Sequence, residues 1–414
     1  MLYDIYDTSR QSLASTGLLL NSISKAMLDF LGGRPFGAYL GAAERGLRDY
    51  GRPEWDIDFL GGGKSLLIKK DNAHPFCHLV SFSFKTFGTR PTVFLVAPMS
   101  GHYATLLHDT VRVLLKDFDV CVTEWINPRH VPLNKGQFSL SDYVLFIEDQ
   151  LERFCLEHKN TTVFAVCQPA PPVLAAVARI EKKQKTGPAT MVLMGGPIDA
   201  RQSPTTPNTL ASRHSIEWFK KNLIHKIPAR FEGAGRSVYP GFLQYLGFWS
   251  MNPEKHNQAH FDYYTNLLFN NKDKVDKYLK FYNEYNAVMD LTAEFYLETV
   301  ETVFQKFSLA RGEWKIHGEL IEPSAIKKCR LLTIEGMRDD IAGQGQTSAA
   351  LSLCTGLSAN QKKSYLDEKA GHYGLFSGSR WEQAVYPVLR DFCLQKKKTA
   401  PRKTTARKTT KTKK

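Results

Sequence analysis

The most informative stretch of this chain is Thr161-Thr162-Val163-Phe164-Ala165-Val166-Cys167-Gln168-Pro169-Ala170. Its first six residues are β-branched or apolar and predict a buried strand, and the apolar run 173–178 predicts a helix after it. Cys167 stands at the turn, and Pro169 suits a first helical turn because its missing N–H needs no partner there. A helix N-terminus lowers the pKa of a thiol and so raises its reactive thiolate fraction. Cys167 is therefore a candidate nucleophile, with a buried core cysteine as the alternative.

Composition narrows the class of protein. The 414 residues are 43% hydrophobic and 12% aromatic, enough for a large core or two lobes. The seven cysteines are scattered without a Cys-x-x-Cys pair, which excludes a disulfide framework and a zinc ribbon. The Gly-rich run 61–65 lacks the upstream glycine of a P-loop and is interpreted as a turn. No secretory signal and no run of about 20 apolar residues is found, so we expect a reduced, intracellular protein. Separately, we expect no metal and no other cofactor.

The net charge of +14 is concentrated at one end of the chain. Residues 396–414 hold ten Lys and Arg and no acidic residue, which leaves +4 for residues 1–395. This tail has no apolar period and is predicted to be disordered. It is either a solubilising extension or a salt-sensitive contact for a polyanion such as nucleic acid or an anionic surface layer. Because it has no aromatic residue, sequence-specific nucleic-acid binding is not expected.

An alternation of strands and helices predicts a parallel sheet with right-handed crossovers. Helices are predicted at 103–115, at 141–157 with Ser141 as N-cap, and after Cys167. The predicted strands are 91–97, 118–125, 161–166, 189–196 and 329–336.

The remaining segments complete the predicted domain organisation. Residues 1–85 are expected to form a helix-rich N-terminal segment, and residues 86–199 with 325–395 the core. Residues 200–324 interrupt the alternation, are rich in aromatic rings, and end in a helical stretch at about 272–307. We expect this insertion to cover the carboxyl edge of the sheet as a lid, where α/β proteins bind ligands. The predicted substrate contacts are Trp218, Phe248 and Trp249 in the lid and His102 in the core; for His102, substrate-side packing is favoured over a catalytic role.

An acid and a base follow Cys167 in the order nucleophile, acid, base that α/β-hydrolases use. Asp339 comes directly after the strand 329–336, and His372 lies on a Gly-flanked loop near the end of the core. His372 would take the thiol proton while Asp339 orients the imidazole, with Asp340 as the rival acid. The fold class expected is therefore an α/β-hydrolase with a mostly parallel, doubly wound sheet.

A tetrahedral oxyanion needs two N–H donors. One is predicted from Gln168, the residue after the nucleophile. The other is predicted from Met99 or Ser100, since Pro98 has no N–H.

Five segments in order resemble the intracellular polyhydroxybutyrate depolymerases: 97–103, 166–170, 194–199, 336–347 and 370–374. The resemblance runs from about residue 1 to Phe392 and leaves out the basic tail. It implies that Cys167 is the nucleophile, Asp339 the acid and His372 the base. It also implies hydrolysis of native amorphous polyester to 3-hydroxybutyrate oligomers or monomer through an acyl-cysteine, by a cytoplasmic enzyme bound to polyester granules.

Two other functions remain open at this point. Polyester synthases are similar around their catalytic cysteine, which usually lies between glycines where this chain has Ala165 and Pro169. A synthase-like acyltransferase would use a hydroxyacyl-CoA. The other alternative is a non-catalytic protein that binds granules or nucleic acid.

Overall fold

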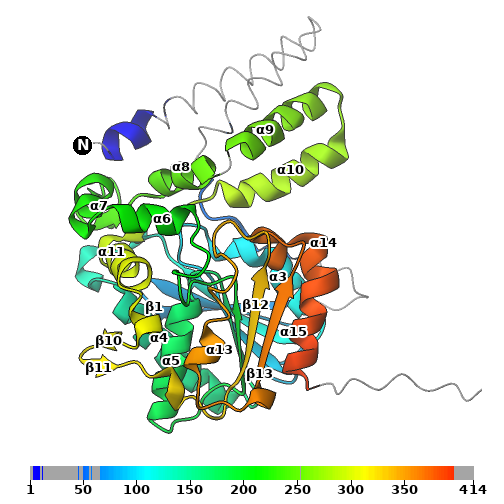
Figure 1. The fold of residues 1–414 in the computed structure, drawn as a ribbon. Coiled ribbons are helices and arrows are strands. Elements are labelled where there is room, and N and C mark those ends of the chain that lie inside the picture. Colours follow the sequence, from blue (N-terminus) through cyan, green and yellow to red (C-terminus); the bar gives the residue numbers. More distant parts are fainter. Residues whose placement is uncertain are drawn as a thin grey trace, which may run out of the picture.

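The computed structural model describes residues 3–9, 12, 45, 50–55, 57, 66–251 and 253–395, without the side chains of 248–251, 253 and 255. Helices surround a central sheet (Figure 1). Within the described residues, eight strands form this sheet in the order β1-β2-β4-β3-β5-β6-β12-β13. β2 is antiparallel to both of its neighbours and all other pairs are parallel. This order and these directions confirm the predicted α/β-hydrolase fold. The strands are β1 (Leu67–His74), β2 (Cys77–Ser83), β3 (Thr92–Val96), β4 (Asp119–Trp125), β5 (Thr162–Val166), β6 (Thr190–Met194), β12 (Arg330–Gly336) and β13 (Lys362–Asp367).

The start of the sheet differs from the prediction. β1 and β2 lie in the segment 1–85 that was expected to be helix-rich, so the core begins at Leu67 and not at residue 86. The first six residues of β1 are all exposed, and the strand lies at the sheet edge beside β2. Because neither of its faces is buried, its sequence carries no alternating apolar pattern from which a strand could be predicted.

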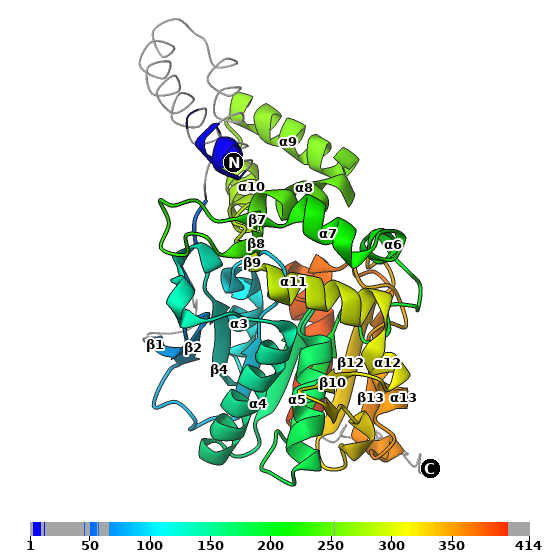
Figure 2. The same ribbon diagram turned by 90° about the vertical axis from the view of Figure 1, so that its left-hand side faces the viewer.

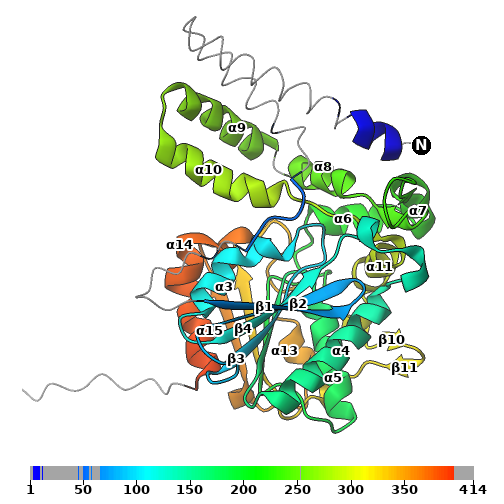
Figure 3. The same ribbon diagram turned by 180° about the vertical axis from the view of Figure 1, so that it is seen from behind.

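Helices cover both faces of the sheet, which is why β3, β5 and β6 are apolar and buried along their whole length. One face packs against α4 (Leu140–Glu157) and α5 (Ala170–Lys182). The opposite face packs against α3 (His108–Leu114) and α15 (Tyr386–Cys393) (Figure 3). The two layers explain why a continuous apolar run such as 162–166 forms a strand here.

Helix α4 begins with a capping box that differs from the predicted N-cap. Ser139, not Ser141, is the N-cap: its hydroxyl accepts the Asp142 N–H at 3.1 Å, and Asp142 accepts the Ser139 N–H at 2.8 Å. The Ser141 hydroxyl instead donates to Glu298 of α11 at 2.6 Å. The start of α4 is thereby joined to the inserted segment.

Residues 200–324 lie mostly over the carboxyl edge of the parallel strands, and we call the part from α6 to η4 the cap (Figure 2). The helical stretch expected at 272–307 is interrupted between Asn286 and Thr292. A short hairpin, β10 (Lys315–Ile316) and β11 (Glu319–Leu320), lies away from the cap. The cap elements are α6 (Thr206–Arg213), α7 (Ile216–Leu223), β7 (His225–Lys226), β8 (Ser237–Tyr239), α8 (Gly241–Met251), α9 (Pro253–Leu268), α10 (Lys272–Tyr285), β9 (Leu291–Thr292), α11 (Ala293–Thr299) and the π-helical turn η4 (Val300–Gln305).

The remaining short helices lie mostly in loops of the core. They are α12 (Ser308–Arg311), α13 (Ala350–Leu353), α14 (Gly378–Arg380), the 3-10 turns η1 (Ala104–Leu107), η2 (Pro128–His130), η3 (Leu133–Lys135), η5 (Pro323–Ala325), η6 (Ala359–Gln361) and η7 (Tyr373–Leu375), and the π-helical turn η8 (Trp381–Val385). None of the helices in the described ranges has the length and apolar character needed to cross a bilayer. The basic tail 396–414 and the glycine run 61–65 lie outside the described residues.

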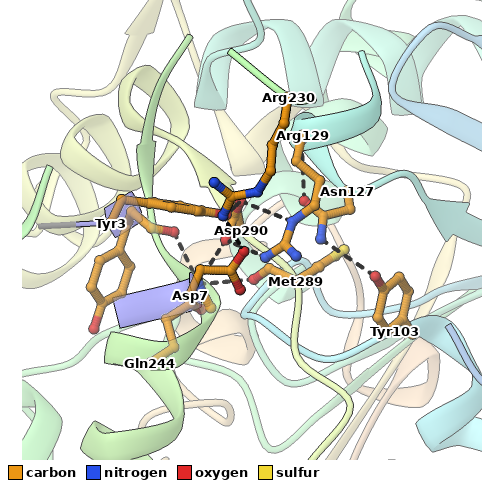
Figure 4. A network of polar contacts seen from close by, with 11 residues as sticks. Tyr3, Asp7, Tyr103, Asn127, Arg129, Arg230, Gln244, Met289 and Asp290 are labelled. Atoms are coloured by element: carbon orange, nitrogen blue, oxygen red, sulfur yellow. Dashed lines mark hydrogen bonds and ion pairs between the residues drawn. The ribbon is translucent and has the colours of Figure 1, made fainter. Parts of the chain in front are cut away.

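Asp290, in the interruption after α10, is a fully buried carboxylate that joins three parts of the chain (Figure 4). It accepts hydrogen bonds from the Tyr3 hydroxyl at 2.7 Å, from the Gly241 N–H at 2.9 Å and from the Arg129 guanidinium at 3.2 Å. Arg230 pairs with Asp7 in the same region. The helix of residues 3–9 is thus held against the cap at the point where α8 begins.

The cap is also joined to the loop that follows β3. The Met289 N–H donates to the Gly101 carbonyl at 2.6 Å, and the Gln244 carboxamide donates to the Met289 carbonyl at 3.1 Å. His102 lies next to this contact, with its Nε2 3.1 Å from the Tyr285 carbonyl. The loop therefore depends on the cap for its conformation.

Replacing Asp290 by asparagine leaves Arg129 without its carboxylate partner in a largely buried position. We expect Asp290→Asn to lower the free energy of unfolding by about 3 kcal/mol, because breaking a buried ion pair from one side is costly. Urea unfolding followed by far-UV circular dichroism measures this. Asp276→Asn, on the exposed side of α10, is the matched control and should change it by less than about 0.5 kcal/mol; equal effects of the two variants would contradict the role of Asp290.

Candidate active site

Cys167 occupies a strained turn between β5 and α5. Its φ is +69°, in the left-handed region that costs energy for a residue with a Cβ. The turn is held because the Cys167 N–H donates to the Met194 carbonyl at 2.7 Å, and the Cys167 carbonyl accepts the Ala170 N–H at 3.1 Å. Such a turn raises the side chain above the sheet. Cys167 is partly exposed, whereas five of the other six cysteines are buried.

Two glycines after β6 make room for this turn and for the histidine beside it. A Cβ on Gly196 would lie 2.2 Å from the Ala170 Cβ and 2.6 Å from the Cys167 carbonyl oxygen. Gly195 has a φ of +56°, and a Cβ there would lie 3.3 Å from His372 Cε1. We call the turn at Cys167 the elbow. Any side chain at position 196 would displace this turn, so a residue without a Cβ is required there.

The structure brings His372 and Asp339 together. His372 Nδ1 lies 2.8 Å from Asp339 Oδ2, and the Asp339 carboxylate is fully buried. The other carboxylate oxygen accepts the N–H groups of Ile341 and Ala342, both at 2.9 Å. Asp340, the rival acid, is exposed. Of the two neighbouring aspartates, Asp339 is therefore the one placed to orient the histidine.

Cys167 is near enough to His372 to influence the pKa of its imidazole, as Asp339 does from the Nδ1 side. Burial alone would lower the pKa of His372, but the hydrogen-bonded Asp339 carboxylate and the neighbouring Cys167 raise that pKa well above its usual value. An imidazolium is favoured at this position. A histidine held in this way by a carboxylate can take a proton from a neighbouring thiol.

The loop after β3 lies beside Cys167. The Met99 N–H donates to the side-chain oxygen of Gln168 at 3.1 Å, and Met99 and Ser100 line the same cavity as Cys167. The start of the loop is held by the Trp125 indole, which donates to the Ala97 carbonyl at 2.8 Å. The structure thus brings together the nucleophile candidate and the residues predicted as oxyanion donors.

A cavity of about 280 Å³ lies between Cys167 and the cap. Its surface is mostly apolar, and the cap supplies most of the wall. Among the described residues, no group of three or more His, Cys, Asp or Glu is placed to hold a metal ion. The cavity suits a short apolar acyl chain. Its main cap residues are Leu210, Phe219, Tyr239, Leu291, Phe295, Tyr296, Val300 and Phe304.

The predicted substrate contacts lie elsewhere or outside the described side chains. His102 is 2% exposed and bonded to the cap, and burial lowers its pKa to about 4, so it is neutral. Trp218 stacks on His214 at 3.9 Å between ring centroids, while its neighbour Phe219 lines the cavity. The side chains of Phe248 and Trp249 in α8 are outside the described set. The cap residues that do line the cavity come from several elements, with α6, α11 and η4 contributing most of them. The sequence of α11 and η4 was interpreted only as part of one helical stretch.

A second group of residues that the sequence did not identify supports the elbow. The Thr347 hydroxyl accepts the Gly196 N–H at 2.8 Å and donates to the Gly196 carbonyl at 2.9 Å. The buried Glu335 carboxylate in turn accepts the N–H groups of Gly345, Thr347 and Ser348 at 3.1, 2.8 and 2.9 Å. The only signal in the sequence was the Gly-rich run 343–347, in which these roles could not be seen.

Gly196→Ala tests the close approach at the elbow. We expect it to lower the free energy of unfolding by about 1–3 kcal/mol, because the added Cβ overlaps Ala170 and the Cys167 carbonyl. Gly374→Ala is the control, since its Cβ would meet Ala370 at an ordinary 3.8 Å. Thermal unfolding of both variants decides the matter, and a Gly196→Ala protein as stable as the control would show that the elbow can relax freely.

The raised pKa of His372 predicts a pH-dependent effect of Asp339→Asn. Protonation of His372 stabilises the folded protein fully below its unfolded pKa of about 6.5, and this contribution is lost as pH rises through the higher folded pKa. The difference in unfolding free energy between wild type and Asp339→Asn should therefore be larger at about pH 6 than at alkaline pH. Urea unfolding over this range measures it, with Asp340→Asn as control. A difference that does not change with pH would argue against a charged His372.

Comparisons with known proteins concern the second half of the chain and the fold. Residues 195–397, which include Asp339 and His372, match the family model described as PHB de-polymerase C-terminus. No curated protein matches the chain. The similar solved structures include 2-hydroxy-6-oxo-6-phenylhexa-2,4-dienoate hydrolase from Rhodococcus sp. strain RHA1 (13% identity, TM-score 0.45, 79% of this chain and 98% of that chain). They also include an esterase from Exiguobacterium antarcticum (10%, 0.45, 79% and 99%) and a thermophilic esterase from Thermogutta terrifontis (15%, 0.41, 79% and 99%).

The segment 195–397 is thus a match to the C-terminal part of polyhydroxybutyrate depolymerases, set in an α/β-hydrolase fold. Together, the family match and the fold support a carboxylic ester hydrolase.

Proposed function

We propose that the chain is an intracellular polyhydroxybutyrate depolymerase that hydrolyses native amorphous polyester through Cys167, His372 and Asp339. The observation that carries the proposal is the buried His372–Asp339 hydrogen bond close to Cys167, which lines an apolar cavity. The match over residues 195–397 supports the polyester as the substrate class.

The first half of the reaction acylates the cysteine. His372 accepts the thiol proton, and the sulfur attacks the ester carbonyl carbon to form a C–S bond as the carbonyl electrons move to oxygen. When the carbonyl reforms, the ester C–O bond breaks, and His372 returns the proton to the leaving alkoxide. The products are a thioester on Cys167 and a shortened chain that ends in a hydroxyl.

The second half releases the acyl group to water. His372 takes a proton from water, the hydroxide adds to the thioester carbonyl, and the C–S bond breaks to give a carboxylic acid and the Cys167 thiolate. Asp339 keeps Nδ1 of His372 as the donor side, so that the opposite nitrogen faces the reaction. The imidazolium then returns its proton to the thiolate, which restores the Cys167 thiol and the neutral His372 from which the first half starts.

The transient oxyanion needs donors at the elbow. The backbone N–H groups of Gln168, at the start of α5, and of Met99, on the loop after β3, are the proposed pair. The positive end of α5 adds to their effect. Both residues line the cavity together with Cys167, which supports this assignment.

Contact with a polyester granule requires apolar groups on the outside of the enzyme. Phe261 of α9 is 63% exposed, and Phe269, just beyond that helix, is 79% exposed. Large aromatic side chains on the cap favour association with an apolar surface. They support granules as the physical form of the substrate.

The test supplies native amorphous polyhydroxybutyrate granules to purified protein and measures soluble 3-hydroxybutyrate. Cys167→Ala should release at least about a thousandfold less product than wild type, because the nucleophile is lost. Cys393→Ala is the matched control, since Cys393 is the other partly exposed cysteine and lies at the end of α15, away from the cavity. It should keep wild-type activity.

Equal product release by wild type and Cys167→Ala would reject the mechanism. A parallel incubation with 3-hydroxybutyryl-CoA tests the acyltransferase alternative. If that incubation yields polymer and free CoA, and granules are not hydrolysed, the protein is a synthase-like acyltransferase and not a hydrolase.

A further inference from the structure

The side chain of Gln168 occupies one of the two proposed oxyanion donors. Its carboxamide oxygen accepts the Met99 N–H at 3.1 Å, in the place where a substrate carbonyl oxygen would have to bind. Gln168 is the residue directly after Cys167, and its own backbone N–H is the other proposed donor. One donor and the side chain that occupies the other donor therefore belong to the same residue, just before α5.

This contact satisfies a group that would otherwise have no partner. Met99 is fully buried, and the cavity beside it is mostly apolar. A buried backbone N–H without an acceptor costs about 1–3 kcal/mol, so the empty enzyme needs an internal acceptor at Met99. The Gln168 oxygen fills that need until a substrate oxygen replaces it.

The other end of the same carboxamide is held less well. Gln168 Nε2 is buried and has no hydrogen-bond partner among the described residues. A carboxamide bonded through its oxygen alone, on a side chain with three rotatable bonds, is bound weakly enough to be displaced. The resting position of Gln168 is thus stabilised from one side only.

We propose that the Gln168 side chain is a gate in the oxyanion site, which an ester must displace before Cys167 can be acylated. The proposal rests on the proposed function. In the resting enzyme the carboxamide oxygen stands in for the substrate carbonyl oxygen at Met99. On binding, the ester oxygen takes over the Met99 N–H, and Gln168 Nε2 becomes free to find an acceptor.

Two variants separate the gate from other roles of the side chain. Gln168→Ala keeps the backbone N–H but removes the competing oxygen, so acylation should become faster. Gln168→Glu keeps an acceptor at Met99 and adds a negative charge where the oxyanion develops, so acylation should become slower.

The readout is the pre-steady-state burst with p-nitrophenyl butyrate, a soluble ester. We expect the acylation rate constant over KM to rise about two- to tenfold in Gln168→Ala, matching a net hydrogen bond of about 0.5–1.5 kcal/mol. In Gln168→Glu we expect a fall of at least about tenfold. Alkylation of Cys167 by iodoacetamide, which develops no oxyanion, is the control and should stay within about twofold in Gln168→Ala.

Each other outcome overturns the gate. Slower acylation with unchanged alkylation in Gln168→Ala would mean that the carboxamide itself stabilises the transition state of acylation. Equal changes in acylation and alkylation would assign it a structural role only. The proposed function is tested separately, because an absent burst in wild type, or an equal burst in Cys167→Ala, would reject the nucleophile before any statement about Gln168 applies.

Discussion

The backbone of Cys167 in the left-handed region, pressed against Gly196, is the constraint on which the rest of the site depends. The strain at Cys167 persists because hydrogen bonds to Met194 and Ala170 fix the turn from both sides. Gly196 can approach so closely only because it has no Cβ, and Thr347 holds it there through both of its backbone groups. Glu335 then gathers three N–H groups of the loop that carries Thr347. The position of the Cys167 sulfur thus depends on contacts at the carboxyl ends of β5, β6 and β12.

A second chain of contacts couples the cap to the reacting groups. Asp290 joins the helix of residues 3–9, the start of α8 and Arg129, and its neighbour Met289 holds Gly101 on the loop that carries Met99. The cap therefore does more than cover the cavity, since it fixes the loop from which one proposed oxyanion donor comes. The position of the Met99 N–H therefore depends on the cap as well as on the core.

Several parts of this arrangement could be predicted from local patterns. The apolar run before Cys167 and the residues after it specify a strand, a turn and a helix without help from the rest of the chain. Asp339 after a late strand and His372 on a later loop follow the α/β-hydrolase order, and the structure places these two side chains 2.8 Å apart.

By contrast, β1 could not be predicted, because an exposed edge strand carries no apolar alternation. The choice between Asp339 and Asp340 also needed the fold, since only the turn after β12 decides which carboxylate is buried.

The sequence by itself determined the fold class and the candidate nucleophile, because both follow from residues that are neighbours in the chain. The tertiary structure decided the contacts between distant segments. It gave His102 a bond to the cap where substrate-side packing was expected, and it built the cavity wall from several cap elements, with α6, α11 and η4 contributing most. It also set the Gln168 side chain on the Met99 N–H. The physical reason is that burial and hydrogen-bond partners depend on which segments meet in space, and no local pattern around residues 99, 168 or 290 records which segment that will be.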